Sequence, residues 1–245
     1  MSAPIKNSRS FSSETPLMQL YSKFTSPASA GVAIIPSFYF FHWKSNLQQD
    51  LKRPHFNPWT AIKEGARSSP IITAIIGTQM TAQKIIENQI NKIDLGKNNK
   101  NTSMFISALC VGIASAPALA IFNGQSMGHS PFKSLKSLTL RQVGAITARE
   151  TSFLLAIRIS DPFSKAMRTQ LGDNELIEAI ATVFSAVIGS AIGHAPDTAL
   201  TRWQGKLKFR FQDIPKGIMP RTAALIIFSL TYNNVKKVLN FPLEK

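Results

Sequence analysis

The sequence predicts an all-α membrane protein with six transmembrane helices in three pseudo-repeats. Apolar residues make up 44% of the 245 residues and occur in blocks, whereas charged residues make up only 17%. Six of these blocks approach the ~20 apolar residues that a helix needs to cross the hydrocarbon core of a bilayer. Prolines recur at a nearly constant spacing in the first, third and fifth blocks, which indicates repeated units of two helices each.

The expected helices, in chain order, cover residues 28–43, 69–86, 104–122, 146–163, 176–200 and 220–239. The third and fifth contain almost no charge and are the clearest membrane segments, whereas a soluble bundle of buried helices would leave them unexplained. Others carry charges, among them Arg149, Glu150 and Arg158. Charges inside a membrane span are costly and usually face a partner or a water-filled cavity. The six segments therefore favour a pathway for a solute over a simple anchor.

The strongly basic charge of the chain indicates an acidic binding partner. The formal net charge is +15, which suits either a membrane surface or nucleic acid. The low share of charged residues and the absence of a nucleic-acid-binding motif favour the membrane. The single cysteine, Cys110, lies in an apolar run, so no disulfide can form within the chain and we expect a small core residue. Nothing in the sequence indicates a cofactor, a metal site or an enzyme.

The ends and the loops add two expectations. Residues 1–25 form a polar, serine-rich tail, either a weak mitochondrial signal or a frayed end, before a domain over residues 26–240. The loops after the first, third and fifth helices carry a larger excess of basic residues than the other loops and the termini. By the positive-inside tendency, both termini are expected on the face opposite these loops.

Two residue types recur in step with the helices. Pro36, Pro117 and Pro196 lie near the ends of the first, third and fifth helices, at spacings of 81 and 79 residues. A proline inside a helix removes a backbone hydrogen bond and kinks it, so a shared kink is expected in these three helices. Arginines recur at the second, fourth and sixth helices, at spacings of 82 and 72 residues: Arg67, Arg149 and Arg221.

The exit of the fifth helix, PDTALTRWQ, resembles the signature of the mitochondrial carrier family, Pro-x-Asp/Glu-x-x-Lys/Arg-x-Arg-x-Gln. With one residue missing after the proline, Asp197, Arg202 and Gln204 match the acidic, arginine and glutamine positions. In the first helix, FHWKSNLQ puts Lys44 at the lysine position, and in the third, PALAIFNGQ keeps only the glutamine, Gln125.

The second, fourth and sixth helices extend the resemblance. The sixth, KGIMPRTAALIIFSLTYNNVKK, is similar to the last helix of carriers and keeps Tyr232 and Lys236 of their Tyr-Asp/Glu-x-x-Lys pattern. In the fourth, Lys165 fits the lysine position and Asp161 lies one residue before the acidic position. The resemblance implies three repeats, about residues 26–92, 102–170 and 174–240, around a central cavity.

The resemblance also implies gates at the two ends of the cavity. One possible ion pair, Lys44 with Asp197, remains at the matrix side. At the other side, Asp161 is the only obvious acid beside Lys165 and Lys236. Because most of the family's gate charges are replaced, closure is expected to rely on packing, which includes the small-residue pair Gly189 and Gly193.

The family's substrate contacts map to Arg67, Arg149 with Glu150, and Arg221. A guanidinium binds a carboxylate in bidentate fashion and a neighbouring carboxylate can hold an ammonium group, which suits an amino acid. The alternative is that Arg149 and Glu150 form an ion pair with each other and bind no substrate. The resemblance implies transport of a small anionic or zwitterionic metabolite, an amino acid before a nucleotide or carboxylate, across the mitochondrial inner membrane.

We expect a monomer whose partners are the solute and membrane lipid, including cardiolipin, and not nucleic acid. The eroded signatures leave a second hypothesis open, a carrier-like membrane adaptor or insertion factor that no longer transports.

Overall fold

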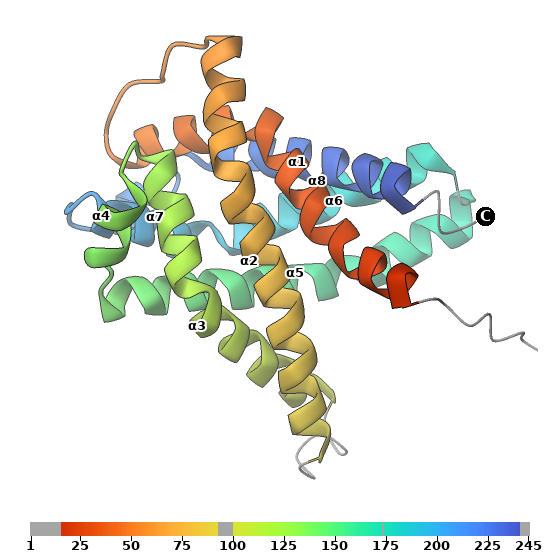
Figure 1. Ribbon diagram of the computed structural model, residues 1–245. Coiled ribbons are helices and arrows are strands. Elements are labelled where there is room, and N and C mark those ends of the chain that lie inside the picture. The colour runs from red at the N-terminus through yellow and green to blue at the C-terminus, as the bar shows by residue number, and fades with distance from the viewer. Residues whose placement is uncertain (1–15, 93–99, 173, 241–245) are drawn as a thin grey trace, which may run out of the picture.

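All secondary structure in the described residues, 16–92, 100–172 and 174–240 of this computed structural model, is helical, which confirms the all-α prediction. In chain order the helices are α1 (Pro16–Gln48), α2 (Pro58–Lys92), α3 (Lys100–Ser126), α4 (Pro131–Lys136), α5 (Leu140–Leu171), α6 (Glu175–Ile192), α7 (His194–Gln204), the short 3-10 helix η2 (Phe211–Asp213) and α8 (Ile218–Asn240) (Figure 1).

Three of these helices contain stretches long and apolar enough to cross a membrane. They are Phe24–Gln48 of α1, Phe105–Ser126 of α3 and all of α6, with mean hydropathies of 1.2, 2.2 and 1.7. These are the first, third and fifth predicted spans. The other three predicted spans fall on α2, α5 and α8, which are more polar. That the chain crosses the membrane six times therefore stays a prediction.

The long helices form a closed ring. Helix α1 packs on α2, α2 on α3, α3 on α5, α5 on both α6 and α7, and α6 on α8. Helix α8 then packs along α1, which closes the ring between the two ends of the described chain. Helices that follow one another in the sequence are thus also neighbours in space, and α6 with α7 fills one position of the ring.

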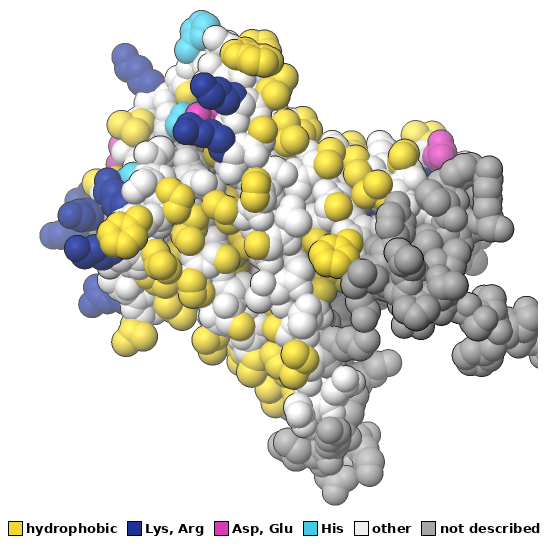
Figure 2. All heavy atoms as spheres, in the orientation of Figure 1, with side chains coloured by type: hydrophobic (Ala, Val, Ile, Leu, Met, Phe, Trp, Pro, Cys, Tyr) yellow, Lys and Arg dark blue, Asp and Glu magenta, His cyan; other side chains and the backbone are white. Residues whose placement is uncertain are grey.

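The two ends of the ring differ. In Figure 1, α4 and α7 lie at one end, whereas α1 begins and α8 ends on the opposite side, where the helices spread apart. Exposed basic side chains gather toward the α4 and α7 end (Figure 2), which we call the basic end; they are Lys52, Arg53, Lys63, Lys133, Lys136, Arg141, Lys206, Lys208 and Arg210. They lie in the connections after α1, α3 and α7 and at the adjoining helix starts.

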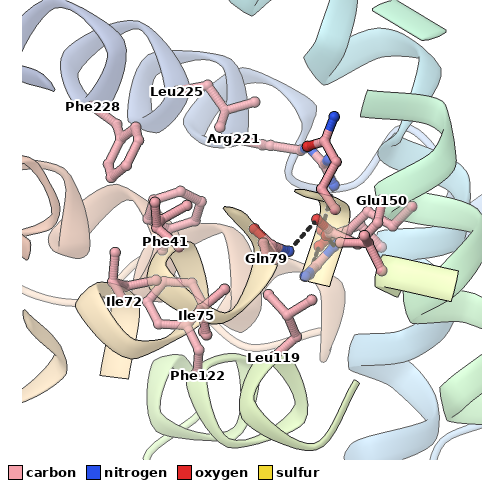
Figure 3. Close-up of a pocket in the computed structure, with 15 residues that line it drawn as sticks. Phe41, Ile72, Ile75, Gln79, Leu119, Phe122, Glu150, Arg221, Leu225 and Phe228 are labelled. Carbon is pink, nitrogen blue, oxygen red and sulfur yellow. Dashed lines mark hydrogen bonds and ion pairs between the residues drawn. The ribbon is translucent and has the colours of Figure 1, made fainter. Parts of the chain in front are cut away.

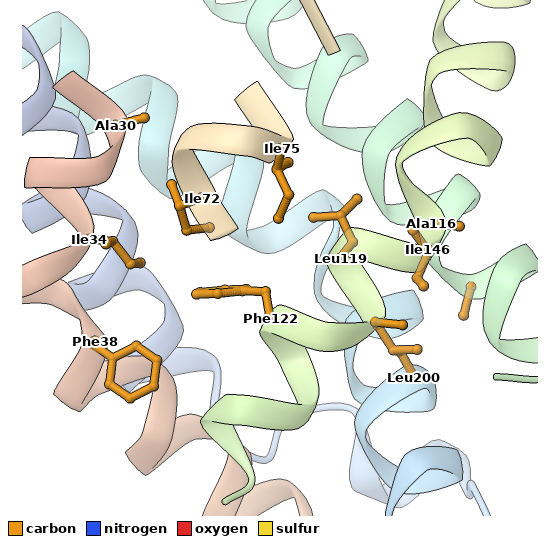
Figure 4. Close-up of a cluster of buried hydrophobic side chains, with 12 residues drawn as sticks. Ala30, Ile34, Phe38, Ile72, Ile75, Ala116, Leu119, Phe122, Ile146 and Leu200 are labelled. Atoms are coloured by element: carbon orange, nitrogen blue, oxygen red, sulfur yellow. The ribbon is translucent and has the colours of Figure 1, made fainter. Parts of the chain in front are cut away.

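A cluster of buried apolar side chains joins one half of the ring (Figure 4). Ile34 and Phe38 of α1 pack with residues of α2, α3, α5 and α7, and the rings of Phe38 and Phe122 meet edge to face at 6.3 Å. Helices α1 and α2 approach closely at Gly65, where a Cβ atom would lie 2.6 Å from the carbonyl oxygen of Ile35. Only glycine fits at this crossing.

The predicted fifth helix over residues 176–200 is wrong as a single helix. Helix α6 ends at Ile192, Gly193 caps it with φ −83° and ψ 4°, and α7 starts at His194. Glycine disfavours the helix interior. Pro196 lies in the first turn of α7, where its missing N–H loses no helical hydrogen bond. Pro36 and Pro117 lie inside α1 and α3, as predicted.

Candidate functional site

Asp197, in the first turn of α7, is the centre of a buried ion network. Its Oδ2 atom accepts a hydrogen bond from Lys44 Nζ at 2.9 Å, and its Oδ1 atom accepts one from Arg149 Nη1 at 3.1 Å. Arg221 Nη1 lies 2.8 Å from Oδ2. One carboxylate therefore meets cations from α1, α5 and α8, and the predicted Lys44–Asp197 pair is present in the structure. The N-terminus of α7 adds favourable partial positive charge.

Glu150 extends this network toward α2. Arg149 Nε donates to Glu150 Oε1 at 3.1 Å, so the adjacent pair expected from the sequence forms within α5. Gln79 Nε2 of α2 donates to Glu150 Oε2, also at 3.1 Å. Arg149 thus bridges two acids, and Gln79 holds the second of them from the neighbouring helix.

Buried polar side chains join the C-terminal ends of α1, α3 and α7. The members of this polar plug are Ser45, Gln48, Asn123, Ser126, Thr198, Thr201 and Gln204. Ser45 and Ser126 share a hydrogen bond of 2.7 Å, Gln48 Nε2 donates to Thr198 at 2.9 Å, and Asn123 Nδ2 donates to Gln204 at 2.7 Å. These bonds link α1, α3 and α7 to one another near the basic end of the ring.

A second ion cluster lies outside the plug, where the connections after α1 and α7 meet. Arg202 Nη1 donates to the carbonyl oxygen of Gln48 at 2.9 Å and to Asp50 Oδ2 at 3.0 Å, and its Nε lies 3.0 Å from Asp213 Oδ2. Lys216 pairs with Asp213 at 2.8 Å and with Asp50. We call these four charged residues the loop ion cluster.

The hydrogen bonds of the loop ion cluster shift its titration. Those from Lys216 hold the pKa of Asp50 and of Asp213 below the usual value of 3.8. Its bonds to Asp213 and Asp50 in turn raise the pKa of Lys216 above 10.5. All three groups therefore stay charged over a wider pH range than they would alone.

A cavity of about 220 Å³ lies beside the buried ion network, between α1, α2, α3, α5 and α8 (Figure 3). One side is apolar and includes Phe41, Ile72, Ile75, Phe122, Leu225 and Phe228. The other side carries Gln79, Arg149, Glu150, Asp197 and Arg221. The cavity therefore presents charge to one part of a guest molecule and hydrocarbon to the rest.

Three of the four predicted substrate contacts line this cavity, namely Arg149, Glu150 and Arg221. Arg67 does not belong to it. Its side chain is 68% exposed, pairs with Glu64 at 3.2 Å, and lines a different cavity of about 500 Å³ together with residues of the α3–α4 connection.

The structure separates the predicted gate residues. Lys44, Asp197, Arg202 and Gln204 all lie in the connected set of buried polar groups described above. Lys236 lies on α8, where its ammonium group is 5.7 Å from the centre of the Tyr232 ring. Asp161 and Lys165 belong to α5, but the structure does not describe the positions of their side chains. The second gate therefore stays a prediction.

Sequence reasoning missed Gln79 and three members of the loop ion cluster, Asp50, Asp213 and Lys216. Gln79 lies seven residues after Ile72, on the face of α2 that carries the buried Ile72 and Ile75. A polar residue on an apolar helix face is a detectable signal.

No protein-family model matches this chain and no curated protein sequence matches it. The resemblance to mitochondrial carriers therefore rests on the sequence motifs alone.

Proposed function

We propose that this chain is a transporter of the mitochondrial carrier type that moves a small organic anion or zwitterion by alternating access. One observation supports the proposal above all. A cavity inside a closed helical ring holds two buried arginines, Arg149 and Arg221, directly next to an acid, Asp197, that also joins the polar plug at one end. A solute that binds these arginines would touch the closed gate.

The arrangement suggests how binding could open the gate. A solute carboxylate that pairs with Arg149 or Arg221 competes with Asp197 for the same guanidinium groups. Asp197 also binds Lys44, and Gln48 of the plug lies 3.4 Å from its Oδ2 atom, so a shift of Asp197 would loosen contacts between α1 and α7. A ligand changes a conformational equilibrium only by its differential affinity for the two states. Exchange of ion-pair partners would supply that difference.

We place the protein in the mitochondrial inner membrane with the basic end toward the matrix. Three apolar helices support membrane association, and by the positive-inside tendency the more basic loops lie on the matrix side. In this orientation the polar plug closes the matrix side, and the cavity opens toward the side where the helices spread apart. Helices α2, α5 and α8 would cross the membrane with their polar residues turned to the cavity.

Uptake by the purified protein in liposomes tests the proposal. Labelled amino acids, nucleotides and carboxylates are offered to the wild type, to Arg149→Ala and to Arg141→Ala. Arg141 is a matched control because it is an exposed arginine of the same helix. We expect the wild type and Arg141→Ala to take up the same solute, and Arg149→Ala to lose about tenfold or more of that rate, since a charged hydrogen bond to the solute is lost.

A carrier-like adaptor without transport activity is the second candidate. It is favoured by the fact that Arg149 and Arg221 already face acids of the same chain, so the site is neutralised in part without a solute. This candidate predicts that wild type and Arg149→Ala are equally inactive with every solute, and that exposed lysines of the basic end cross-link to a partner protein in intact mitochondria.

A further inference from the structure

The charges of the buried site do not cancel. Among its described residues, the three cations Lys44, Arg149 and Arg221 meet only two carboxylates, Glu150 and Asp197. All five side chains are at least 83% buried, because the most exposed of them, Glu150, retains 17% of its side-chain surface. An uncompensated charge away from water is costly, so the site favours one additional negative charge.

Arg221 is the cation with unused hydrogen-bonding capacity. Its side chain is 6% exposed and its Nη1 atom pairs with Asp197 Oδ2 at 2.8 Å, whereas its buried Nε atom donates no hydrogen bond to any described residue. A guanidinium presents paired N–H groups that match the two oxygens of a carboxylate. Arg221 lines the cavity, so a carboxylate there would lie beside a guanidinium group whose charge it can share with Asp197.

Both acids of the site already have cationic partners within the chain. Each oxygen of Glu150 accepts a hydrogen bond, one from Arg149 and one from Gln79. Each oxygen of Asp197 also accepts one, from Arg149 and from Lys44. An ammonium group placed here would add a fourth cation to a site that already has one in excess. A zwitterion is therefore a poorer guest than a simple anion.

The remainder of the cavity is apolar. Leu225 lies one helical turn beyond Arg221 on α8, and Phe41, Phe122 and Phe228 complete a hydrocarbon wall (Figure 3). An apolar cavity of about 150 Å³ holds a benzene molecule. The volume here, about 220 Å³, suits a tail of comparable size together with its carboxylate. A second charge or a sugar in this part would lose its hydration without replacement.

We propose that the cavity binds the anion of a monocarboxylic acid with a branched aliphatic or aromatic tail. The carboxylate pairs with Arg221, and the tail lies against Leu225, Phe228 and Phe41. This proposal concerns binding, and it rests on the proposed transport function only in that the bound anion is also the transported solute.

Four probes of one size separate the contributions of charge and tail. They are 4-methylpentanoate, its zwitterionic counterpart leucine, its uncharged counterpart 4-methylpentanamide, and the dicarboxylate glutarate. Affinity is measured by calorimetry on the purified protein in detergent at pH 7, because the protonated acid diffuses through lipid unaided. We expect 4-methylpentanoate to bind about tenfold or more tightly than each of the other three, as a site with matched groups rejects analogues that lack one. Equal or tighter binding of leucine or glutarate would overturn the proposal.

Two variants of α8 test the position of the tail without touching the charges. Leu225→Asn places an amide in the apolar wall, and Met219→Asn makes the same kind of change at a residue that is 79% exposed and does not line the cavity. We expect Leu225→Asn to weaken binding of 4-methylpentanoate about tenfold and Met219→Asn to leave it unchanged. Equal affinities for the two variants would contradict the assigned position.

The binding and transport proposals can fail separately. If 4-methylpentanoate binds as expected but no solute enters liposomes, the cavity assignment stands and transport fails. If leucine or glutarate is bound and transported in preference, transport stands and the monocarboxylate assignment fails. If none of the four probes binds, the monocarboxylate assignment is overturned, and uptake of any other solute still decides the transport proposal.

Discussion

At the scale of single residues, Asp197 is the position on which the site depends. Its carboxylate is the shared partner of Lys44, Arg149 and Arg221. We expect Asp197→Asn to lower the free energy of unfolding by about 3–5 kcal/mol, because removal of one partner leaves buried charges uncompensated. Denaturant unfolding of the purified protein in detergent, followed by circular dichroism, measures this change.

Asp50→Asn is the matched control for that variant. Asp50 also meets two cations, Arg202 and Lys216, but its side chain is 49% exposed. It has a φ of 63°, a conformation that asparagine also tolerates. An exposed ion pair contributes about 0–1 kcal/mol, so the loss should stay within that range. Similar losses for both variants would show that burial of Asp197 does not decide its contribution.

Gly193 positions Arg221 and gives a second prediction at this scale. A Cβ atom at Gly193 would lie 2.9 Å from Arg221 Nη2 and 3.2 Å from the carbonyl oxygen of Gly189, so Gly193→Ala must displace the guanidinium. We expect its affinity for 4-methylpentanoate to fall about tenfold, since misplacement of a charged donor loses most of its bond.

The control for Gly193→Ala is Gly144→Ala on α5. A Cβ atom there would have no neighbour within 4 Å, and alanine favours a helix over glycine by about 0.5–1 kcal/mol. Gly144→Ala should therefore bind 4-methylpentanoate as the wild type does and unfold at a slightly higher temperature. Unchanged affinity in Gly193→Ala would mean that Arg221 does not hold the ligand.

The sequence predicted some residue contacts and not others for a physical reason. The Lys44–Asp197 pair follows from motif positions on helices that converge. Arg67 occupies the corresponding position of α2, but Glu64 lies one turn before it and provides a local partner at the surface. The rotation of a helix about its own axis depends on packing with its neighbours, which the spacing of arginines alone does not contain.

At the scale of helices, the break between α6 and α7 is the main departure from prediction. The predicted segment over residues 176–200 joins the strongly apolar α6 to the first residues of α7, which is more polar. Local preferences could have revealed the break, since Gly193 disfavours a helix and Pro196 suits a first turn. The break matters for the site, as it places Asp197 in a helical first turn directly beside Arg149 and Arg221.

The loop ion cluster gives a pH prediction for the junction of α1 and α7. Folding lowers the pKa of Asp50 and Asp213 from 3.8, so their contribution to stability is complete above pH ~4 and is lost as the pH falls through the lower folded values. We expect the protection of amides in residues 205–217 against hydrogen exchange to fall as the pH is lowered below 4, after correction for the slower intrinsic exchange at acid pH. Mass spectrometry of peptides from this segment measures it.

Asp213→Asn supplies the comparison for the pH experiment. Without the Asp213 carboxylate, exchange in this segment should already be fast at pH 5 and should show a smaller additional change on acidification. If the wild type and Asp213→Asn respond to pH in the same way, the loop ion cluster does not hold the junction.

At the scale of the whole molecule, the structure arranges the helices as a closed ring, whereas the three repeats of two helices stay a prediction. The contact of α8 with α1 could not be read from any local pattern, because it joins opposite ends of the described chain. The number of membrane spans remains a prediction for a related reason. Helices α2 and α5 carry charges that count against a span in any sliding window, whereas a ring can turn those charges toward its interior.

The single cysteine tests whether this ring lies in a membrane. The prediction that Cys110 is a core residue is wrong, because Cys110 is exposed on α3, inside the apolar stretch Phe105–Ser126, so in a bilayer its thiol faces lipid. A polar maleimide does not enter the bilayer core, so it cannot reach a thiol there. We expect polyethylene-glycol maleimide to leave Cys110 unmodified in permeabilised membranes and to modify it after denaturation in dodecyl sulfate.

The control is a second cysteine, introduced as Ser137→Cys. Ser137 lies exposed next to α4 at the basic end, so this cysteine should react in permeabilised membranes without denaturation. Gel shifts report both reactions on one sample, and rapid modification of Cys110 before denaturation would mean that α3 does not cross the membrane.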